Sequence, residues 1–378
     1  MDVAVPRETT PGERRVATVP EAIARLAAKD IKVTIESGAG LGALYDDESY
    51  LAAGATVAPD ADVLYGTADV VCKVQPPTLG EAERLREDSA LLCMLQPASN
   101  LELVQVLVRR RIMAFSLDLL PRISRAQAMD ALSSQATVTG YCGALFAASR
   151  LHRFFPMFMT AAGTVPPAKV LVLGAGVAGL QAIATARRLG AVVRAYDVRP
   201  AARDEVRSLG ATFVELQLEA QEGQGGYAAE QSEEFLARQR ELIGNEVAAA
   251  DAVITTAAIP GRRAPLLVTG EMVRRMRAGS VVVDLAAETG GNCELSEPGA
   301  ETAVNDVVVY GASNLASSLS THASFLYARN IAEMLALLVS DGAFRPDFED
   351  EIVSSTCVTC AGEIRHGATR ALIEGGSS

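Results

Sequence analysis

A buried strand, a glycine-rich turn and a helix follow one another directly in the middle of the chain. Val170–Leu173 is a continuous apolar run, which is typical of a central parallel strand. Gly174, Gly176 and Gly179 come next, and Leu180–Leu189 has a helical composition. In this arrangement the first glycine permits a tight turn, the second lets the backbone approach a ligand, and the third lets the helix pack closely on the strand. The segment therefore predicts a doubly wound α/β domain.

An acidic residue closes the next predicted strand at the spacing of a dinucleotide site. Val192–Tyr196 leads into Asp197, 18 residues after Gly179. A carboxylate there accepts hydrogen bonds from ribose hydroxyls and repels a 2′-phosphate, which favours NAD over NADP, although Arg199 weakens this preference. The alternative is a packing turn with an ordinary acid, but the order of the elements favours a nucleotide site. The predicted cofactor contacts are Gly174, Gly176, Val177, Gly179, Asp197, Val198 and Arg199.

Length and charge restrict the class of protein. The chain has 378 residues, more than a single hydrophobic core usually serves, so we expect two domains. The net charge of −12 argues against a nucleic-acid partner and requires local backbone amides to hold an anionic cofactor. No apolar run reaches about 18 residues, and the N-terminus lacks a basic region followed by an apolar core. We therefore expect a cytoplasmic globular chain.

The six cysteines do not indicate a disulfide framework, because they are scattered through a long chain without a secretory signal. Cys357 and Cys360 form a C-x-x-C pattern. A structural zinc site would need a second ligand pair, which the three histidines do not supply. We therefore expect two incidental thiols and no metal.

Strand and helix patterns alternate along the chain, which predicts layered α/β structure with parallel sheets. Strands are expected at 3–5, 31–35, 69–74, 91–95, 112–116, 281–284 and 307–310; helices at 21–28, from Asn100, over 129–155 and from about 320; and a loop at 163–167. The predicted fold is two Rossmann-like doubly wound parallel-sheet domains joined by a long helix. Residues 1–133 and 320–378 form one domain, to which the last helices return, and residues 134–319 form the NAD(H)-binding domain.

Further motifs extend over essentially the whole chain. They are Pro6–Thr9, Glu13–Ala17, Pro121–Asp130 with Ser133–Gln135, Thr255–Arg262, Asp284–Ala286 and Gly290–Glu294. With these motifs the chain resembles the NAD(H)-binding component of proton-translocating nicotinamide nucleotide transhydrogenase, in the group that includes alanine dehydrogenase. The resemblance implies an oxidoreductase and translocase of the Si-specific/Re-specific type. One segment departs from the family, because Asn314–Ser318 lacks the usual proline and arginine.

The resemblance implies that Arg122, Gln127, Asp130 and Ser133 position the dihydronicotinamide. We expect Arg122 to pair with Asp130, and Gln127 to bond the ribose or carboxamide. An alternative for Gln127 is a capping box with Ser124, in which it only closes a helix N-terminus. The family also has a mobile glycine-rich loop whose tyrosine covers the bound nucleotide. Here that loop is Glu222–Tyr227, so the resemblance assigns roles to Gly226 and Tyr227, and a cofactor contact to Ala258.

Alanine dehydrogenase is the principal alternative, because its fold and cofactor would be the same. In that relative an arginine and a lysine bind the substrate and a histidine handles protons. Arg15 and Lys73 occupy the first two positions, but Gln96 occupies the third. Glutamine does not titrate, so it cannot move the proton that amine oxidation requires. Hydride transfer between two nicotinamides needs no such group.

The resemblance also implies partners. NADP(H) would bind to a beta subunit, membrane-spanning chains would couple hydride transfer to proton movement, and this component would form a homodimer. Because the sequence contains no membrane helix, we expect a separate subunit that docks peripherally on the cytoplasmic face. A third hypothesis is a non-catalytic NAD-binding regulator, which would have no reason to keep Arg122, Gln127, Asp130 and Tyr227 together.

Overall fold

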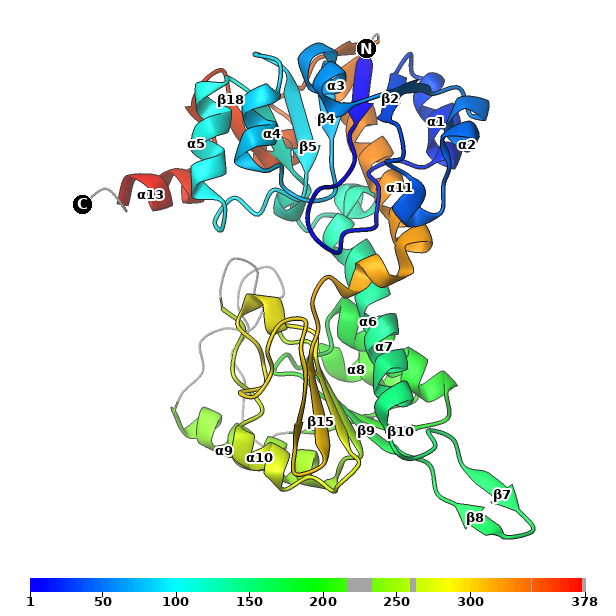
Figure 1. The fold of residues 1–378 in the computed structure, drawn as a ribbon. Helices are drawn as coiled ribbons and strands as arrows, with labels where there is room; N and C mark the ends of the chain where they lie inside the picture. The colour runs from blue at the N-terminus through cyan, green and yellow to red at the C-terminus, as the bar shows by residue number, and fades with distance from the viewer. Residues whose placement is uncertain (216–232, 259–262, 341, 376–378) are drawn as a thin grey trace. The chain divides into compact units, whose positions relative to one another are not determined.

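The computed structural model describes residues 1–215, 233–258, 263–340 and 342–375 (Figure 1). The chain divides into two compact units. Unit 1 comprises Met1–Gln135 and Ala316–Ser378, and unit 2 comprises Ala136–Leu315. The chain leaves unit 1 within helix α6 (Ala131–Arg150) and returns to it within the 3-10 helix η6 (Leu315–Leu319). Each unit has its own sheet and its own apolar cores.

Unit 1 is built on a sheet with the strand order β19-β18-β6-β5-β4-β1-β2-β3. The strands are β1 (Asp2–Val5), β2 (Lys32–Glu36), β3 (Thr56–Ala58), β4 (Val70–Cys72), β5 (Ala90–Cys93), β6 (Met113–Ser116), β18 (Cys357–Cys360) and β19 (Glu363–Ile364). The six from β6 to β3 are parallel, whereas β18 pairs antiparallel with both β6 and β19. Because the strand order reverses beside β1, the carboxyl ends of β1 and β4 form a topological switch point.

Helices cover both faces of this sheet (Figure 1). One face packs against α1 (Pro20–Ala27), α2 (Asp47–Ala52), α11 (Ser320–Leu338) and α12 (Glu351–Thr356), and the other against α3 (Ala61–Thr67), α4 (Leu79–Arg84), α5 (Leu101–Arg109) and α13 (Gly367–Gly375). Successive side chains of a strand point to opposite faces of a sheet. In β1, Val3 and Val5 therefore pack in the core on the first face, and Ala4 packs in the core on the second. The short elements are η1 (Leu41–Ala43), η2 (Leu117–Leu119), η3 (Ser124–Met129), β16 (Val339–Ser340) and β17 (Ala343–Phe344).

Unit 2 has a sheet with the strand order β11-β10-β9-β12-β13-β15-β14, in which only the β14–β15 pair is antiparallel among the described strands. Its strands are β9 (Lys169–Leu173), β10 (Val192–Tyr196), β11 (Thr212–Phe213), β12 (Ala252–Thr255), β13 (Val281–Asp284), β14 (Glu301–Val304) and β15 (Val307–Gly311). Its helices are α7 (Val177–Arg188), α8 (Ala202–Ser208), α9 (Glu233–Ala249), α10 (Gly270–Arg274) and η5 (Ala287–Thr289). Val170 and Val172 pack in the core with α7, whereas Leu171 and Leu173 pack in the core with α9 and α10.

The predicted fold class is confirmed, but three segments differ from their predictions. Helix α6 ends at Arg150 and does not reach Phe155, because His152 donates its amide to Gly279 O at 3.3 Å and leaves the helical pattern. The predicted loop at 163–167 contains β8 (Gly163–Val165), which pairs with β7 (Phe158–Thr160) in a hairpin. The segment after 320 is not all helix, since β18 and β19 extend the unit 1 sheet in the antiparallel sense.

Candidate functional site

The glycine-rich turn joins β9 to α7 in unit 2. Gly174 has a left-handed φ of +101°, and a Cβ at this position would lie 2.6 Å from Thr256 Oγ1. A Cβ at Gly179 would lie 1.9 Å from Gly174 O, so the close crossing of helix and strand requires glycine. Gly176 is the N-cap of α7, and a Cβ added there would meet nothing within 4 Å among the described residues. The first turn of α7, beginning at the exposed Val177, therefore starts beside open space that suits an anion.

Asp197 follows β10 and is bonded to the glycine-rich turn. Its Oδ2 accepts a hydrogen bond from the amide of Ala175 at 2.7 Å. Its Oδ1 accepts from the amide and the Nε of Arg199, both at 2.9 Å, and Arg199 Nη2 also donates to Ala175 O at 3.2 Å. The structure thus brings together Gly174–Gly179, Asp197 and Arg199, all of them among the predicted cofactor contacts, and the arginine covers the carboxylate. Val198, between the two, is half-buried against the core of α9 and α10.

The remaining cofactor contacts inferred from the resemblance lie in loops. Ala258 is exposed, three residues after the end of β12. Gly226 and Tyr227 lie outside the described residues, as does the rest of the glycine-rich segment predicted as a lid.

The four residues predicted to position the dihydronicotinamide lie in unit 1, around η3 and the start of α6. Asp130 and Ser133 are brought together, since Asp130 Oδ1 accepts the Ser133 amide at 2.9 Å and Oδ2 accepts its hydroxyl at 2.5 Å. Arg122 and Gln127 are both exposed. The capping box proposed as an alternative for Gln127 is wrong, because the N-cap of η3 is Ile123 and that N-cap carries no side-chain cap hydrogen bond.

Arg15 and Lys73 are buried in unit 1, and both carry carboxylate partners. Arg15 donates to Glu13 Oε2 at 2.6 Å, and Lys73 Nζ lies 3.4 Å from Glu8 Oε2 and 3.3 Å from Glu81 Oε1. Burial raises the pKa of Glu8 by more than the charge of Lys73 lowers it. At Glu81 the same burial is outweighed by the charge of Lys73 and by hydrogen bonds, so its pKa is lowered. Sequence reasoning located the two cations but not their carboxylate partners.

Gln96 lies in the turn between β5 and α5. Its φ of +47° is unusual for a residue other than glycine, and two side chains hold the turn. Asp118 Oδ1 accepts a hydrogen bond from the backbone N–H of Gln96 at 3.2 Å, and Asn100 Nδ2 donates to the backbone carbonyl of Gln96 at 3.1 Å. The Gln96 side chain is exposed, so the position expected to carry a histidine in an alanine dehydrogenase carries a side-chain carboxamide.

Two residues that sequence reasoning did not assign to the site support its loops in unit 2. Asp284 is fully buried at the end of β13, and Asn292 is fully buried eight residues later. The motifs Asp284–Ala286 and Gly290–Glu294 contain both residues, but only their long-range hydrogen bonds reveal a role.

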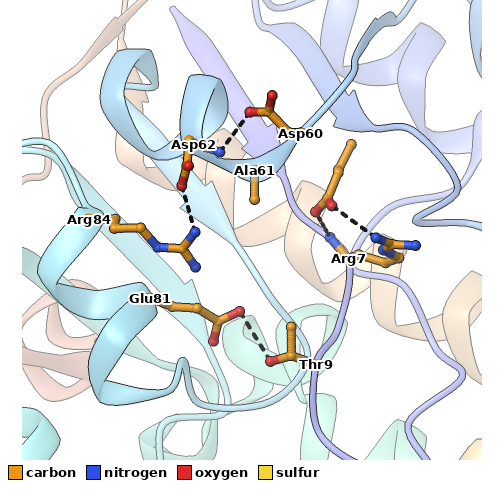
Figure 2. A pocket seen from close by; sticks show the side chains of 8 residues that line it. Arg7, Thr9, Asp60, Ala61, Asp62, Glu81 and Arg84 are labelled. Carbon is orange, nitrogen blue, oxygen red and sulfur yellow. Dashed lines mark hydrogen bonds and ion pairs between the residues drawn. The ribbon is translucent and has the colours of Figure 1, made fainter.

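A pocket in unit 1 contains none of the predicted site residues (Figure 2). It is lined by Arg7, Thr9, Glu36, Asp60, Ala61, Asp62, Glu81 and Arg84. Arg84 pairs with Asp62 at 2.6 Å, Arg7 pairs with Glu36 at 3.5 Å, and Thr9 donates to Glu81 at 3.2 Å (Figure 2). Each of the two arginines is therefore paired with a carboxylate, and two further carboxylates, Asp60 and Glu81, also line the pocket.

The described residues contain no group of three or more His, Cys, Asp and Glu side chains placed to hold a metal ion. Cys357 and Cys360 are free thiols on β18. Burial raises the pKa of Cys357 to about 12, which keeps it protonated at neutral pH. None of the helices in the described part of the chain combines the length and apolarity needed to cross a membrane.

Comparisons with known proteins place these features in a family. Residues 4–139 match the profile described as alanine dehydrogenase/PNT, N-terminal domain, and residues 143–367 match the corresponding C-terminal domain. The chain is 47% identical to the first portion of the NAD(P) transhydrogenase alpha subunit of Rhodospirillum rubrum, over 97% of this chain and 98% of that relative. It is 31% identical, over 88% of each chain, to alanine dehydrogenase of Mycobacterium tuberculosis.

A solved structure gives the same result. The transhydrogenase from Sinorhizobium meliloti is 43% identical and has a TM-score of 0.86, covering 97% of this chain and 100% of the other. These comparisons confirm the resemblance inferred from the motifs.

Proposed function

This chain belongs to the alanine dehydrogenase/PNT family, and on that premise we propose that it is the NAD(H)-binding subunit of a proton-translocating transhydrogenase. It transfers hydride between NAD(H) held on this chain and NADP(H) held on a partner beta subunit. Membrane-spanning partner chains couple this transfer to proton movement, and the chain acts as a homodimer at the cytoplasmic face of the membrane.

The geometry of unit 2 supports NAD(H) binding. The room beside Gly176 and the first turn of α7 suits a pyrophosphate, which backbone amides hold without a positive side chain. Asp197 at the end of β10 suits the adenosine ribose. Because Arg199 covers this carboxylate with two hydrogen bonds from its guanidinium, ribose binding requires the arginine to move or to share its partner. Ala258 and Val198 are assigned to the rim of the same site, and Gly226 and Tyr227 to its cover.

The observation that carries the choice of reaction is Gln96. An amino-acid dehydrogenase needs a group that accepts and returns a proton when amine becomes imine, and an amide does not titrate. Direct transfer between two nicotinamides needs only a dry site that fixes the two rings near contact. When bound, NADH supplies the hydride, and no residue of this chain has to gain or lose a proton.

In this proposal Arg122, Gln127, Asp130 and Ser133 orient the dihydronicotinamide. The two hydrogen bonds between Asp130 and Ser133 fix both side chains at the start of α6. Because the Ser133 hydroxyl donates its one hydrogen to Asp130, the pair presents preorganised acceptors to a ligand. The exposed Arg122 and Gln127 remain accessible to a ligand. Tyr227 is assigned to exclude water from the hydride path.

Alanine dehydrogenase remains the second candidate, because a relative of that name is 31% identical and this chain keeps buried Arg15 and Lys73. The test follows reduction of an NAD⁺ analogue under three conditions: NADPH with the chain alone, NADPH with an NADP(H)-binding partner domain added, and alanine with the chain alone. We expect reduction only when NADPH and the partner are both present. Alanine-dependent reduction by the chain alone would contradict the proposal, and tight NADH binding without turnover in any pairing would favour a regulator.

The site residues are tested in the same assay. We expect Gln127→Asn and Asp130→Asn to lower the rate about 10²-fold, because small misplacements of a reacting group have effects of that order. Gln105→Asn is the matched control, since Gln105 is an exposed glutamine on α5 outside every predicted site. Equal rates for Gln127→Asn and Gln105→Asn would remove Gln127 from the proposed site.

A further inference from the structure

A single buried carboxylate organises the loop after β13. Asp284 has no exposed surface, and its two oxygens accept five hydrogen bonds between 2.6 and 3.0 Å. The donors are the hydroxyls of Thr255 and Ser296 and the amides of Ala286, Asn292 and Cys293. A buried charge is stable only when such donors surround it, so the loop 285–296 is fixed around this side chain.

The glycines of the Gly290–Glu294 motif are required by this arrangement. Gly291 has a left-handed φ of +75°, and a Cβ there would lie 3.1 Å from Asp284 Oδ2 and 2.9 Å from Ser296 Oγ. Any other side chain would therefore press on the carboxylate and strain the backbone. The motif lets the loop close over Asp284.

Asn292 transmits this order to the neighbouring loop, which follows β12. Its Nδ2 donates to Ala257 O and to Pro265 O, both at 2.8 Å, and its Oδ1 accepts the Ala257 amide at 2.9 Å. Asn292 is itself fully buried, and its own amide donates to Asp284. Ala257 is thus held on both its amide and its carbonyl by one side chain.

The same loop is bonded to the glycine-rich turn. Thr256 Oγ1 donates to Gly174 O at 3.0 Å. On the other side of β9, the Ala175 amide donates to Asp197 at 2.7 Å. The glycine-rich turn is therefore held from two directions, by Asp197 at β10 and by the Asp284–Asn292 network at β12 and β13.

We propose that Asp284 and Asn292 are positioning residues that set Thr256–Ala258 against the nicotinamide half of NAD(H), independently of the adenosine half. The inference rests on the proposed NAD(H) binding. A dinucleotide lies across the carboxyl edge of a doubly wound sheet, with one nucleotide on each side of the first strand. Asp197 marks the adenosine side at β10, so the loops after β12 and β13 face the half that carries the hydride.

The chain offers a matched control at the amino ends of the same parallel strands. Asp251 is also a buried carboxylate and precedes β12 at its amino end, where it accepts the Lys169 amide at 2.9 Å. Asp284→Asn and Asp251→Asn thus make the same chemical change at the two ends of neighbouring strands. Only the first lies in the proposed network.

The experiment measures the Kd of the full chain for NADH and for 5′-AMP by calorimetry, with thermal unfolding in parallel. We expect Asp284→Asn and Asn292→Ala to raise the Kd for NADH about tenfold, equal to about 1.4 kcal/mol, and to leave the Kd for 5′-AMP within about twofold. Asp251→Asn should lower the Tm and leave both Kd values unchanged. If Asp284→Asn does not fold, Thr256→Val removes the bond to Gly174 with almost no change in volume and should shift NADH binding in the same direction.

Each other result overturns the inference. An equal loss of NADH and 5′-AMP affinity would mean that the network supports unit 2 as a whole. Unchanged NADH affinity in Asp284→Asn, Asn292→Ala and Thr256→Val would mean that the network does not affect ligand binding. Wild-type chain that binds 5′-AMP but not NADH would also contradict it. Wild-type chain that binds neither ligand would refute the proposed function itself, and the inference with it.

Discussion

The two units have similar sheets, but the residues that follow the carboxyl ends of their central strands differ. Both units are doubly wound around a central strand, β1 in unit 1 and β9 in unit 2. In unit 1 the switch point is filled by charged side chains of the chain itself, since Glu8 follows β1 and Lys73 follows β4. In unit 2 the turn after β9 is rich in glycine and leaves open space at Gly176.

This difference shows that two units with the same fold can have different chemistry at the carboxyl ends of their strands. A doubly wound sheet always presents the ends of its parallel strands at one edge, but the residues after those strands decide whether that edge binds a ligand. Unit 1 stabilises its edge with buried ion pairs, whereas unit 2 stabilises its loops with a buried carboxylate, Asp284, that is surrounded by uncharged donors. Three predictions test this contrast, from the largest expected effect to the smallest.

Lys73→Met should have the largest effect on stability. It leaves Glu8 and Glu81 buried without their cation, and breaking a buried pair in this way costs about 3–5 kcal/mol. Urea unfolding would measure the change, and Lys32→Met at an exposed position of β2 is the control, expected within about 0.5 kcal/mol of wild type. Adding Glu81→Gln to Lys73→Met should recover part of the loss. Wild-type stability of Lys73→Met would mean that unit 1 does not depend on its charged edge.

Glu13 should make unit 1 sensitive to acid. Burial raises the pKa of Glu13, but hydrogen bonds and charge from Arg15 outweigh burial and lower the pKa from 4.5 to about 2. Because the folded pKa lies below the unfolded one, the contribution is complete above pH 4.5 and is lost as pH falls through 2. It amounts to about 3 kcal/mol.

The free energy of unfolding, measured from about pH 6 down to about pH 2, checks this prediction. The difference between wild type and Glu13→Gln should shrink as pH falls, whereas the exposed Glu363→Gln should follow wild type throughout. A constant difference between wild type and Glu13→Gln would contradict the lowered pKa.

The same glycine substitution should act in opposite directions in the two units. Gly179→Ala in α7 places a Cβ 1.9 Å from Gly174 O, so overpacking should destabilise unit 2 by about 1–3 kcal/mol. Gly66→Ala in α3 meets nothing within 4 Å and should stabilise unit 1 by up to about 1 kcal/mol, since alanine is the better helix former. Differential scanning calorimetry would show both shifts. Equal effects at the two positions would mean that the glycine-rich turn tolerates a side chain.

Much of the fold could be predicted because its signals are local. The apolar run before Gly174 and the acid after Val192–Tyr196 belong to elements whose order alone identifies a dinucleotide-type unit. The hairpin β7–β8 and the strand at Cys357–Cys360 were missed, because their pairing partners decide their conformation. Cys357–Cys360 joins β6, which lies more than 200 residues earlier in the chain.

In the candidate site too, features with a local sequence signal could be predicted and features that depend on the backbone conformation alone could not. The glycine requirement at Gly174 and Gly179 could be predicted, because a left-handed φ and a close helix–strand crossing exclude a side chain there. The backbone does not restrict Gly176 or Asp197 in this way, and their contacts with the cofactor stay predictions. For Gln127 local reasoning offered a capping box, and the structure places the N-cap one residue earlier, at Ile123. A cap depends on backbone angles that three residue letters do not determine.

The sequence by itself determined the two α/β units and the glycine turn, because strand and helix periodicity and glycine spacing act over a few residues. The family followed from the resemblance carried by the motifs along the chain. Only the tertiary structure decided which charges meet. Lys73 pairs with Glu8, which lies 65 positions earlier in the sequence, and Asn292 bonds Ala257 across 35 positions. Such contacts follow from the packing of whole strands and helices, and no local pattern in the sequence specifies them.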